Sequence, residues 1–311
     1  MNRGRTTVTA VEDISFDLGE SEILSLVGES GSGKTTVARC IMGLATPTSG
    51  TIKFQNNPVT GLKGGALKNY LKNVQMIFQD PFESLYPRFD VYSTVSIPIR
   101  QLTGETNREV IRETVSRLMQ EVGLDPVETM YKLPHQLSGG ERQRVSIAKS
   151  LASNPKVLIA DEPITMLDAS HRLNILSLIL NLKARRNLSV LLITHDLASA
   201  KFMSDRTAVM YRGRLLEIGE TSAILSRPRH PYTELILNST PKLAKSENRT
   251  IAQKDGAEIG FVPERGCIFQ PRCKYSTPEC LQAQPPLEKK SGPILAACYN
   301  PLNVESEKSS N

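Results

Sequence analysis

One glycine-rich segment constrains the fold of this chain more than any other. Residues 28–35 read Gly-Glu-Ser-Gly-Ser-Gly-Lys-Thr and fit the pattern G-x-x-x-x-G-K-[ST]. An apolar stretch over residues 23–27 precedes them and a helical pattern over residues 34–44 follows, so we predict that they join a strand to a helix. The alternative is a glycine-rich turn with a chance lysine, but such a turn would not have to lie between a strand and a helix.

This turn has the chemistry of a phosphate-binding loop. Glycines let successive backbone N–H groups point inward, and the helix that follows adds the positive end of its dipole. Lys34 is expected to reach the β- and γ-phosphates of a nucleotide, and Thr35 to hold Mg²⁺ through its hydroxyl. The predicted nucleotide-binding residues here are Gly28, Glu29, Ser30, Gly31, Ser32, Gly33, Lys34, Thr35 and Thr36.

A pair of adjacent carboxylates, Asp161 and Glu162, ends another apolar stretch. Because the carboxyl ends of parallel strands face the ligand crevice, we expect Mg²⁺ to bind there. Asp161 would help to hold the metal, and Glu162 would polarise an attacking water as general base. The alternative is that the two carboxylates form a helix cap ahead of Pro163.

A second glycine turn lies upstream of those carboxylates. Residues 137–144 read Leu-Ser-Gly-Gly-Glu-Arg-Gln-Arg, and a helix is predicted to begin at the glycines. Ser138, Gly139 and Gly140 would then offer a hydroxyl and exposed N–H groups as a second anion site. The alternative is that Ser138 is an ordinary helix N-cap.

Apolar stretches alternate with helical patterns along the chain, which indicates an α/β fold with a mainly parallel sheet. The predicted strands are residues 22–27, 74–78, 156–161, 189–194 and 207–211. Over residues 106–122 apolar residues recur at three- and four-residue steps, which predicts a helix. Thr106 and Glu109 are expected to form its capping box, and Gly123 to end it.

The last third of the chain is predicted to differ from the rest. An edge strand over residues 214–219 is followed by short helices that open at Thr221 and His230, and then by a polar linker over residues 241–260. Residues 304–311 read as a disordered tail. The predicted domains are two parts of an α/β core (1–84 and 155–239), a helical insertion (85–154) and a cysteine-containing extension with its tail (240–311).

Charge and hydropathy exclude several classes of protein. Lys and Arg number 38 and Asp and Glu 32, and the resulting net charge of +6 does not demand a nucleic-acid partner. No window approaches the roughly 20 apolar residues of a bilayer span, and the amino terminus does not read as a secretory signal. We therefore expect a cytoplasmic protein whose membrane role is peripheral.

Three further residues complete a recognisable order of motifs. Gln79 follows a predicted strand, Asp168 comes shortly after the carboxylate pair, and His195 ends another strand. In this order the motifs of residues 8–233 resemble those of the ATPase subunit of ABC transporters. The resemblance implies a P-loop (RecA-like) core, ATP and Mg²⁺ as ligands, and head-to-tail dimers. In such dimers ATP lies between the phosphate loop of one subunit and the second glycine turn of the other.

The same resemblance implies a role for each of these residues. Gln79 would sense the γ-phosphate and Mg²⁺ and couple to the membrane subunit, Asp168 would communicate across the dimer, and His195 would contact the γ-phosphate. Taken singly, each has a plainer reading as a polar loop residue, a helix cap or a strand-end histidine. The predicted catalytic residues are thus Glu162, His195 and Gln79.

One feature of ABC ATPases is missing from the matched region. They carry an aromatic residue near their start that stacks on adenine, whereas no Tyr, Phe or Trp precedes Phe16. We expect the adenine platform to be absent or supplied by another residue. ATP is therefore implied by the family and not by an adenine site.

A closer resemblance extends over more of the chain. The segments at residues 28–34, 78–85 and 230–233 are similar to those of the oligopeptide and dipeptide importer ATPases. This implies a homologous second ATPase, two membrane permeases and, indirectly, an extracytoplasmic substrate-binding protein as partners at the cytoplasmic face of the membrane. Relatives of these importers also carry nickel or oligosaccharides. A soluble ABC ATPase acting on nucleic acid or ribosomes is the alternative from another class.

Four of the five cysteines lie in the extension. Five, six and seventeen residues separate Cys267, Cys273, Cys280 and Cys298, which is not the spacing of a common zinc knuckle. Four thiolates can nevertheless hold a [4Fe–4S] cluster or Zn²⁺. The resemblance favours the iron–sulfur cluster, and four unligated thiols remain the third alternative.

Overall fold

The computed structural model describes residues 9–80, 85–239 and 265–303. The predicted linker at 241–260 and the predicted tail at 304–311 lie outside these residues. Within the chain there are two compact units. The central unit is Leu18–Ile23 with Thr35–Ile193, and the terminal unit is Met1–Asp17, Leu24–Lys34 and Thr194–Asn311.

The sheet of the central unit is parallel. Its strands are β4 (Val74–Ile77), β5 (Val157–Asp161) and β6 (Ser189–Thr194). β5 lies between the other two, and its Val157 pairs with both Val74 and Ser189. Almost all of these side chains are buried, as expected for continuous apolar runs that are covered on both faces. The strands confirm the predicted arrangement, with ends that shift by no more than about one residue.

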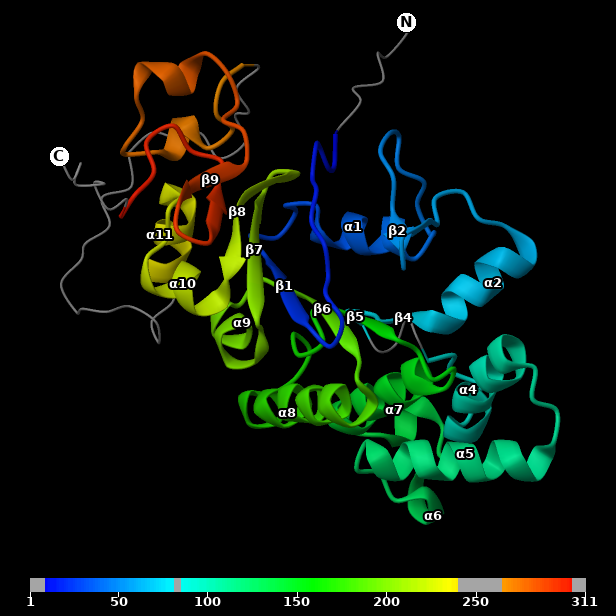
Figure 1. Ribbon diagram of the computed structural model, residues 1–311. Helices are drawn as coiled ribbons and strands as arrows, with labels where there is room; N and C mark the ends of the chain where they lie inside the picture. The colour runs from blue at the N-terminus through cyan, green and yellow to red at the C-terminus, as the bar shows by residue number, and fades with distance from the viewer. Residues whose placement is uncertain (1–8, 81–84, 240–264, 304–311) are drawn as a thin grey trace, which may run out of the picture. The chain divides into compact units, whose positions relative to one another are not determined.

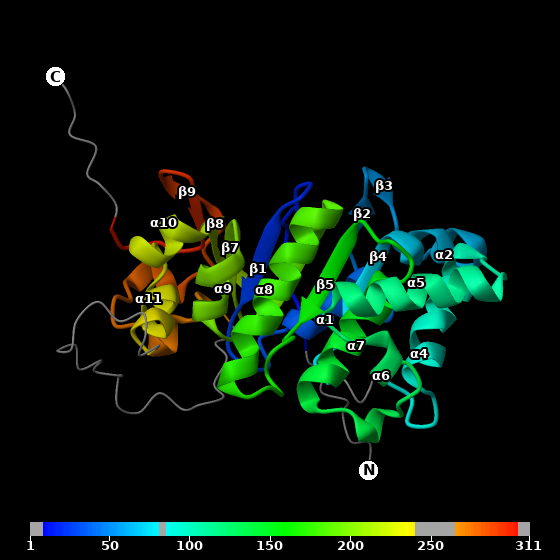
Figure 2. The same ribbon diagram turned by 90° about the horizontal axis from the view of Figure 1, so that it is seen from below.

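Helices and a short hairpin complete the central unit. They are α1 (Lys34–Ile41), β2 (Lys53–Phe54), β3 (Asn57–Pro58), α2 (Gly64–Asn73), α4 (Val91–Pro98), the π-helical turn η1 (Ile99–Thr103), α5 (Arg108–Glu121), α6 (Pro126–Thr129), the 3-10 turn η2 (Pro134–Gln136), α7 (Gly139–Leu151) and α8 (Ala169–Arg186). Figure 2 shows α4, α5 and α7 close together, as their contacts confirm. The apolar residues Ile111, Val115, Leu118 and Met119 of α5 are buried. In the described part of the chain, no helix has the length and hydropathy to cross a bilayer.

The helix predicted over residues 106–122 is confirmed as α5, but the predicted capping box is wrong. Asn107 is the N-cap, and its Oδ1 accepts the backbone N–H of Glu109 at 2.9 Å. The N–H of Thr106 instead donates to the Glu105 side chain. The side-chain amide of Asn107 thus caps the helix, in place of the Thr106 hydroxyl that was predicted one residue earlier. Gly123 ends the helix with a positive φ, as predicted.

The terminal unit has a mixed sheet with the strand order β1-β7-β8-β10-β9. Its strands are β1 (Ile23–Val27), β7 (Arg206–Tyr211), β8 (Arg214–Glu220), β9 (Glu288–Ser291) and β10 (Ile294–Ala296). β1 and β7 are parallel, and the other neighbours are antiparallel. Arg212 and Gly213, both with positive φ, form the two-residue turn between β7 and β8.

The prediction that residues 214–219 form an edge strand is wrong. Leu295 of β10 pairs with Ile218 of β8, so β8 lies inside the sheet. The reason is that the extension supplies strands of its own, and one of them covers the edge that β8 would otherwise leave open.

The extension packs on two helices of the terminal unit, α10 (Thr221–Ser226) and α11 (Pro231–Asn238). The third helix of this unit is α9 (Leu197–Met203), and the extension adds the 3-10 turns η3 (Gln270–Arg272) and η4 (Pro278–Leu281). Figure 1 shows the orange and red extension beside the yellow α10 and α11. A buried cluster joins them through Tyr211, Tyr232, Ile268 and Phe269. The helices predicted to open at Thr221 and His230 are confirmed, and His230 caps α11.

Candidate functional site

The phosphate loop (residues 28–34) belongs to the terminal unit and closes around its own lysine. Lys34 is only 4% exposed. Its Nζ donates to the carbonyl oxygens of Gly28 and Glu29 at 2.8 Å each and lies 3.3 Å from Ser32 Oγ. The loop therefore keeps the ammonium group of Lys34 buried against its own carbonyl oxygens, and phosphate binding by this group stays a prediction.

Glycine is required at both ends of this loop by the backbone packed against it. A Cβ at Gly28 would lie 2.0 Å from the carbonyl oxygen of Met210. Gly33 has φ +103°, and a Cβ there would lie 2.4 Å from the carbonyl oxygen of Ala10. The N–H of Gly213 also donates to the carbonyl oxygen of Ser32 at 2.8 Å. The loop is therefore fixed by close backbone contact.

At the end of β5, in the central unit, two of the residues predicted to hold Mg²⁺ lie together. Asp161 is fully buried. The Thr35 hydroxyl donates to Asp161 Oδ1 over 3.5 Å. Mg²⁺ prefers oxygen ligands, and proteins usually hold it with one or two carboxylates; a hydroxyl and a carboxylate oxygen are ligands of this kind. The donor set fits a magnesium ion.

Glu162 follows directly and is held in an unusual backbone conformation. Its φ is +45°, in the left-handed region that is costly for a residue with a Cβ, and its N–H donates to Ile193 at 2.8 Å. Glu162 Oε2 accepts hydrogen bonds from Gln79 Nε2 at 3.2 Å and from Thr165 Oγ1 at 2.9 Å. Gln79 and Glu162, predicted from separate motifs, thus meet. The Thr165 contact was not predicted from the sequence.

The second glycine turn (residues 137–141) forms a capping box at the start of α7. Ser138 Oγ accepts the N–H of Glu141 at 3.2 Å, and Glu141 Oε2 accepts the N–H of Ser138 at 2.8 Å. These hydrogen bonds lower the pKa of Glu141. In the single chain, therefore, Ser138 is the N-cap of α7, as its plainer reading predicts. An anion site at Ser138, Gly139 and Gly140 stays a prediction.

Asp168 and His195 are both exposed. Asp168 stands directly before α8, where its carbonyl oxygen accepts the N–H of His171 at 2.9 Å. His195 directly follows β6. His195 lies at a strand end as expected, whereas Asp168 stands at the N-cap position given by its plainer reading, with no capping hydrogen bond to its side chain among the described residues. Their roles toward a nucleotide and a second subunit stay predictions.

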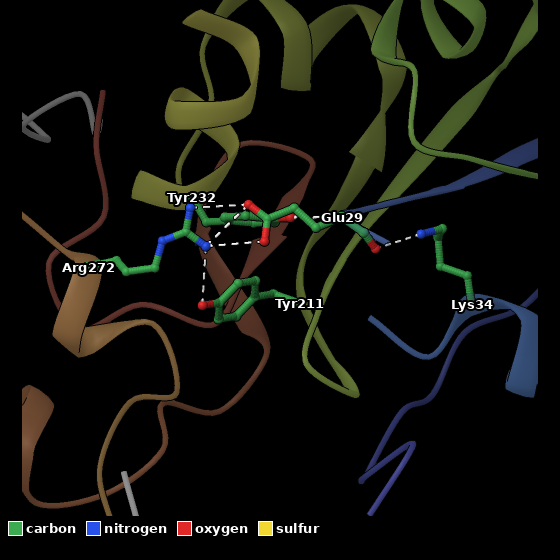
Figure 3. Close-up of polar contacts among 5 residues, drawn as sticks. All are labelled: Glu29, Lys34, Tyr211, Tyr232 and Arg272. Atoms are coloured by element: carbon green, nitrogen blue, oxygen red, sulfur yellow. Dashed lines mark hydrogen bonds and ion pairs between the residues drawn. The ribbon is translucent and has the colours of Figure 1, made fainter. Parts of the chain in front are cut away.

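The extension and helix α11 both contact the phosphate loop, which sequence reasoning missed. Arg272 pairs with the Glu29 carboxylate, and the hydroxyl of Tyr232 accepts the N–H of Glu29 at 3.1 Å (Figure 3). Burial, followed by the nearby charge of Glu29, raises the pKa of Tyr232, so its hydroxyl stays protonated. The only signal in the sequence was the segment at 230–233, which pointed to a family and not to this contact.

The four cysteines of the extension are buried, and none is in a disulfide. Burial, and then the three other thiols, raise the pKa of Cys298 to about 12. Among the described residues, however, no three His, Cys, Asp or Glu side chains are arranged to hold a metal ion. The thiols of Cys267, Cys273 and Cys280 pack as core side chains beside Phe269. The predicted [4Fe–4S] cluster is therefore not supported by this arrangement.

Comparison with protein families places two parts of the chain. Residues 11–165 match the model described as "ABC transporter". Residues 216–280 match "Oligopeptide/dipeptide transporter, C-terminal region", so the segment with Arg272 is part of this second match.

Curated proteins are similar over nearly the whole chain. The "Oligopeptide transport ATP-binding protein OppF" of Escherichia coli (strain K12) is 37% identical over 285 residues, which are 91% of this chain and 85% of that protein. The "Oligopeptide transport ATP-binding protein AppF" of Bacillus subtilis (strain 168) is 38% identical over 296 residues, which are 94% of this chain and 89% of that protein.

A solved structure shares the fold. It is the dimeric post-hydrolysis state of the ATP-binding cassette MJ0796 bound to ADP and Pi. The TM-score is 0.64 at 28% identity, over 71% of this chain and 94% of that one.

Proposed function

This chain belongs to the ABC transporter family of ATP-binding proteins, and from that membership we propose that it drives the import of oligopeptides or dipeptides through separate membrane permeases. Proteins of this family are ATPases that work in transport. The match over residues 216–280 and the names of the relatives support a peptide cargo.

The proposed site residues divide the work of phosphoryl transfer. Lys34, held inside the loop, provides positive charge for the phosphates, and the backbone N–H groups of the loop orient them. Thr35 and Asp161 would hold Mg²⁺, which when bound neutralises charge on the transferred group. Glu162 would accept a proton from the attacking water. The observation that carries the proposal is the hydrogen bond from Gln79 to Glu162, because Gln79 belongs to a separate motif and orients the Glu162 carboxylate.

The test is Glu162→Gln, which keeps the size of the side chain and removes the base. We expect turnover to fall by about 100-fold or more while ATP stays bound. Glu128→Gln, an exposed carboxylate on α6, serves as the control and should hydrolyse ATP at the wild-type rate. Unchanged steady-state hydrolysis in Glu162→Gln would remove Glu162 from this role.

The proposed assembly pairs two ATPase subunits at the cytoplasmic face of the membrane. Ser138, Gly139, Gly140 and Asp168 would act on the nucleotide held by the other subunit, and His195 on the γ-phosphate of its own. The subfamily favours a homologous sister ATPase, with an extracytoplasmic binding protein delivering cargo to two permeases. Co-purification with the two permeases and the sister ATPase supports this assembly, whereas recovery with ribosomes or nucleic acid contradicts it.

We also propose that the four extension cysteines hold a [4Fe–4S] cluster. The support is the resemblance to the peptide importer ATPases, together with one buried cluster that contains Cys267, Cys273 and Cys280, in which the N–H of Cys267 donates to the Cys280 carbonyl oxygen at 2.8 Å. Their side chains would have to turn toward a common centre. The test is iron and sulfide analysis, with zinc measured as well, after anaerobic purification. About four iron and four sulfide per chain supports a cluster, and zinc supports the alternative metal. If neither iron nor zinc is found, the four cysteines are unligated core thiols.

A further inference from the structure

The extension holds the phosphate loop through one ion pair. Arg272, the last residue of η3, donates from Nη1 to Glu29 Oε1 at 3.2 Å and Oε2 at 3.1 Å, and from Nη2 to Oε1 at 3.1 Å. Figure 3 shows the guanidinium facing the carboxylate of Glu29. Such forked pairing fixes orientation as well as distance.

A buried aromatic cluster fixes the position of Arg272. Tyr211, Tyr232 and Phe269 are each no more than 2% exposed, with ring centroids 4.7 to 5.5 Å apart. The Arg272 guanidinium lies 5.7 Å from the Tyr211 ring centroid and 5.8 Å from that of Phe269. These rings restrict both the arginine and the Tyr232 hydroxyl that accepts from the loop.

The cysteine-bearing segment builds the turn from which Arg272 projects. The N–H of Cys267 donates to Cys280 at 2.8 Å, that of Gln270 to Cys267 at 2.9 Å, and that of Cys273 to Gln270 at 3.1 Å. The position of Arg272 therefore depends on the order of this segment.

Glu29 connects the two sides. Its carboxylate is bound by Arg272 and its N–H by Tyr232. Its carbonyl oxygen accepts from Lys34 Nζ at 2.8 Å and from the N–H of Ser32 at 3.2 Å. A displacement of Glu29 would therefore move an acceptor of the lysine that is proposed to bind phosphate.

We propose that Arg272 and Tyr232 are positioning residues that hold the phosphate loop in its nucleotide-binding shape, so that nucleotide affinity is coupled to the order of the cysteine-bearing extension. This inference rests on the proposed role of the loop in binding ATP. Because coupling between two sites is reciprocal, bound nucleotide must also stabilise the extension. The pair is partly exposed, with 32% of the arginine and 44% of the glutamate side chain accessible, so salt weakens the effect.

The first test compares one replacement of an arginine with one replacement of a lysine, both in the full-length chain. Arg272→Met breaks the pair with Glu29, whereas Lys274→Met breaks a pair of the extension with Glu234 of α11, 3.3 Å long, that does not involve the loop. By calorimetry we expect Arg272→Met to weaken ATP binding about fivefold and Lys274→Met to leave it unchanged. KM for ATP should rise with little change in kcat, and Arg272→Lys should fall between wild type and Arg272→Met.

The second test measures the reverse direction. We expect ADP to slow hydrogen exchange of the hydrogen-bonded backbone amides of Cys267, Gln270 and Cys273 in the wild type and in Lys274→Met, but not in Arg272→Met. Equal ATP affinity in the two methionine variants, or equal protection by ADP, overturns the coupling while leaving the ATPase proposal intact. A wild-type chain that binds no ATP overturns both.

Discussion

Two glycine-rich turns open helices in this chain, and they are held in opposite ways. The phosphate loop before α1 encloses Lys34, whose ammonium binds loop carbonyls, and it is fixed from outside by Tyr232 and Arg272. The second glycine turn before α7 is partly exposed, and its hydrogen bonds are internal, since Ser138 and Glu141 exchange them.

The difference shows that similar residues serve different purposes according to where their hydrogen-bond partners come from. The second turn also has a cation, Arg142, but its Nη1 donates to the carbonyl oxygens of Leu137 at 2.9 Å and Pro134 at 3.3 Å, upstream of the glycines. The Arg142 guanidinium therefore binds the backbone that precedes the glycines, whereas the ammonium group of Lys34 lies within its own loop. Of the two turns, the first alone keeps a buried ammonium group inside its own loop, and phosphate binding there stays a prediction.

The largest expected effect comes from adding a methyl group to each turn. Gly28→Ala would place Cβ 2.0 Å from the Met210 carbonyl oxygen, and we expect a loss of about 3 kcal/mol in the free energy of unfolding. Gly139→Ala meets its nearest neighbour, Leu167, at 3.9 Å, and alanine suits a helix better than glycine, so stability should rise by up to about 1 kcal/mol. Denaturant titration measures both, and equal effects would erase the distinction between the turns.

The next effect separates the two cations. Lys34→Ala should weaken ATP binding to the chain by about 100-fold, or about 2.7 kcal/mol, because the buried charge is lost. Arg142→Ala should leave that affinity unchanged, since its side chain supports the other turn. Titration calorimetry is the measurement. Wild-type affinity in Lys34→Ala contradicts the role of the loop.

A smaller effect tests the cap. Ser138→Ala removes the hydroxyl that accepts the Glu141 N–H, which should cost about 1 kcal/mol of unfolding free energy. Ser138→Thr keeps an acceptor and should recover most of this loss. A Ser138→Ala variant as stable as the wild type would show that the hydroxyl does not cap α7 in solution.

The smallest effect depends on pH. The pKa of Glu141 is lowered in the folded chain by its hydrogen bonds with Ser138, so the ionised carboxylate stabilises the turn. This contribution is complete above the ordinary carboxyl pKa of about 4.3 and is lost as pH falls through the lowered folded value. For this partly exposed group we expect a few tenths of a kcal/mol. The stability difference between wild type and Glu141→Gln should shrink from pH 7 to pH 3, and a widening difference contradicts the sign.

Much of the fold and site followed from local sequence. The strands β4, β5 and β6 are continuous apolar runs that must be buried, and the glycine-rich pattern of residues 28–35 predicted the turn between β1 and α1. Gln79 and Glu162 were predicted to follow strands, but their contact was not predicted, because it depends on the pairing of those two strands in the parallel sheet.

The remainder depended on contacts between distant residues. β8 reads as an edge strand until β10, some 75 residues later, pairs with it. Arg272 is one of many basic residues, and nothing in its neighbourhood indicates that Glu29 is its partner. The four cysteines could be grouped by sequence, but whether their thiols face one centre or pack as core side chains depends on the whole extension.

The most direct measurement is a structure of the Glu162→Gln variant with ATP and Mg²⁺ in its paired assembly. We predict that Ser138 Oγ of each subunit lies at hydrogen-bond distance, about 3 Å, from the γ-phosphate of the nucleotide on the other subunit's phosphate loop. A structure in which ATP is bound and Ser138 is remote from every nucleotide would contradict the account.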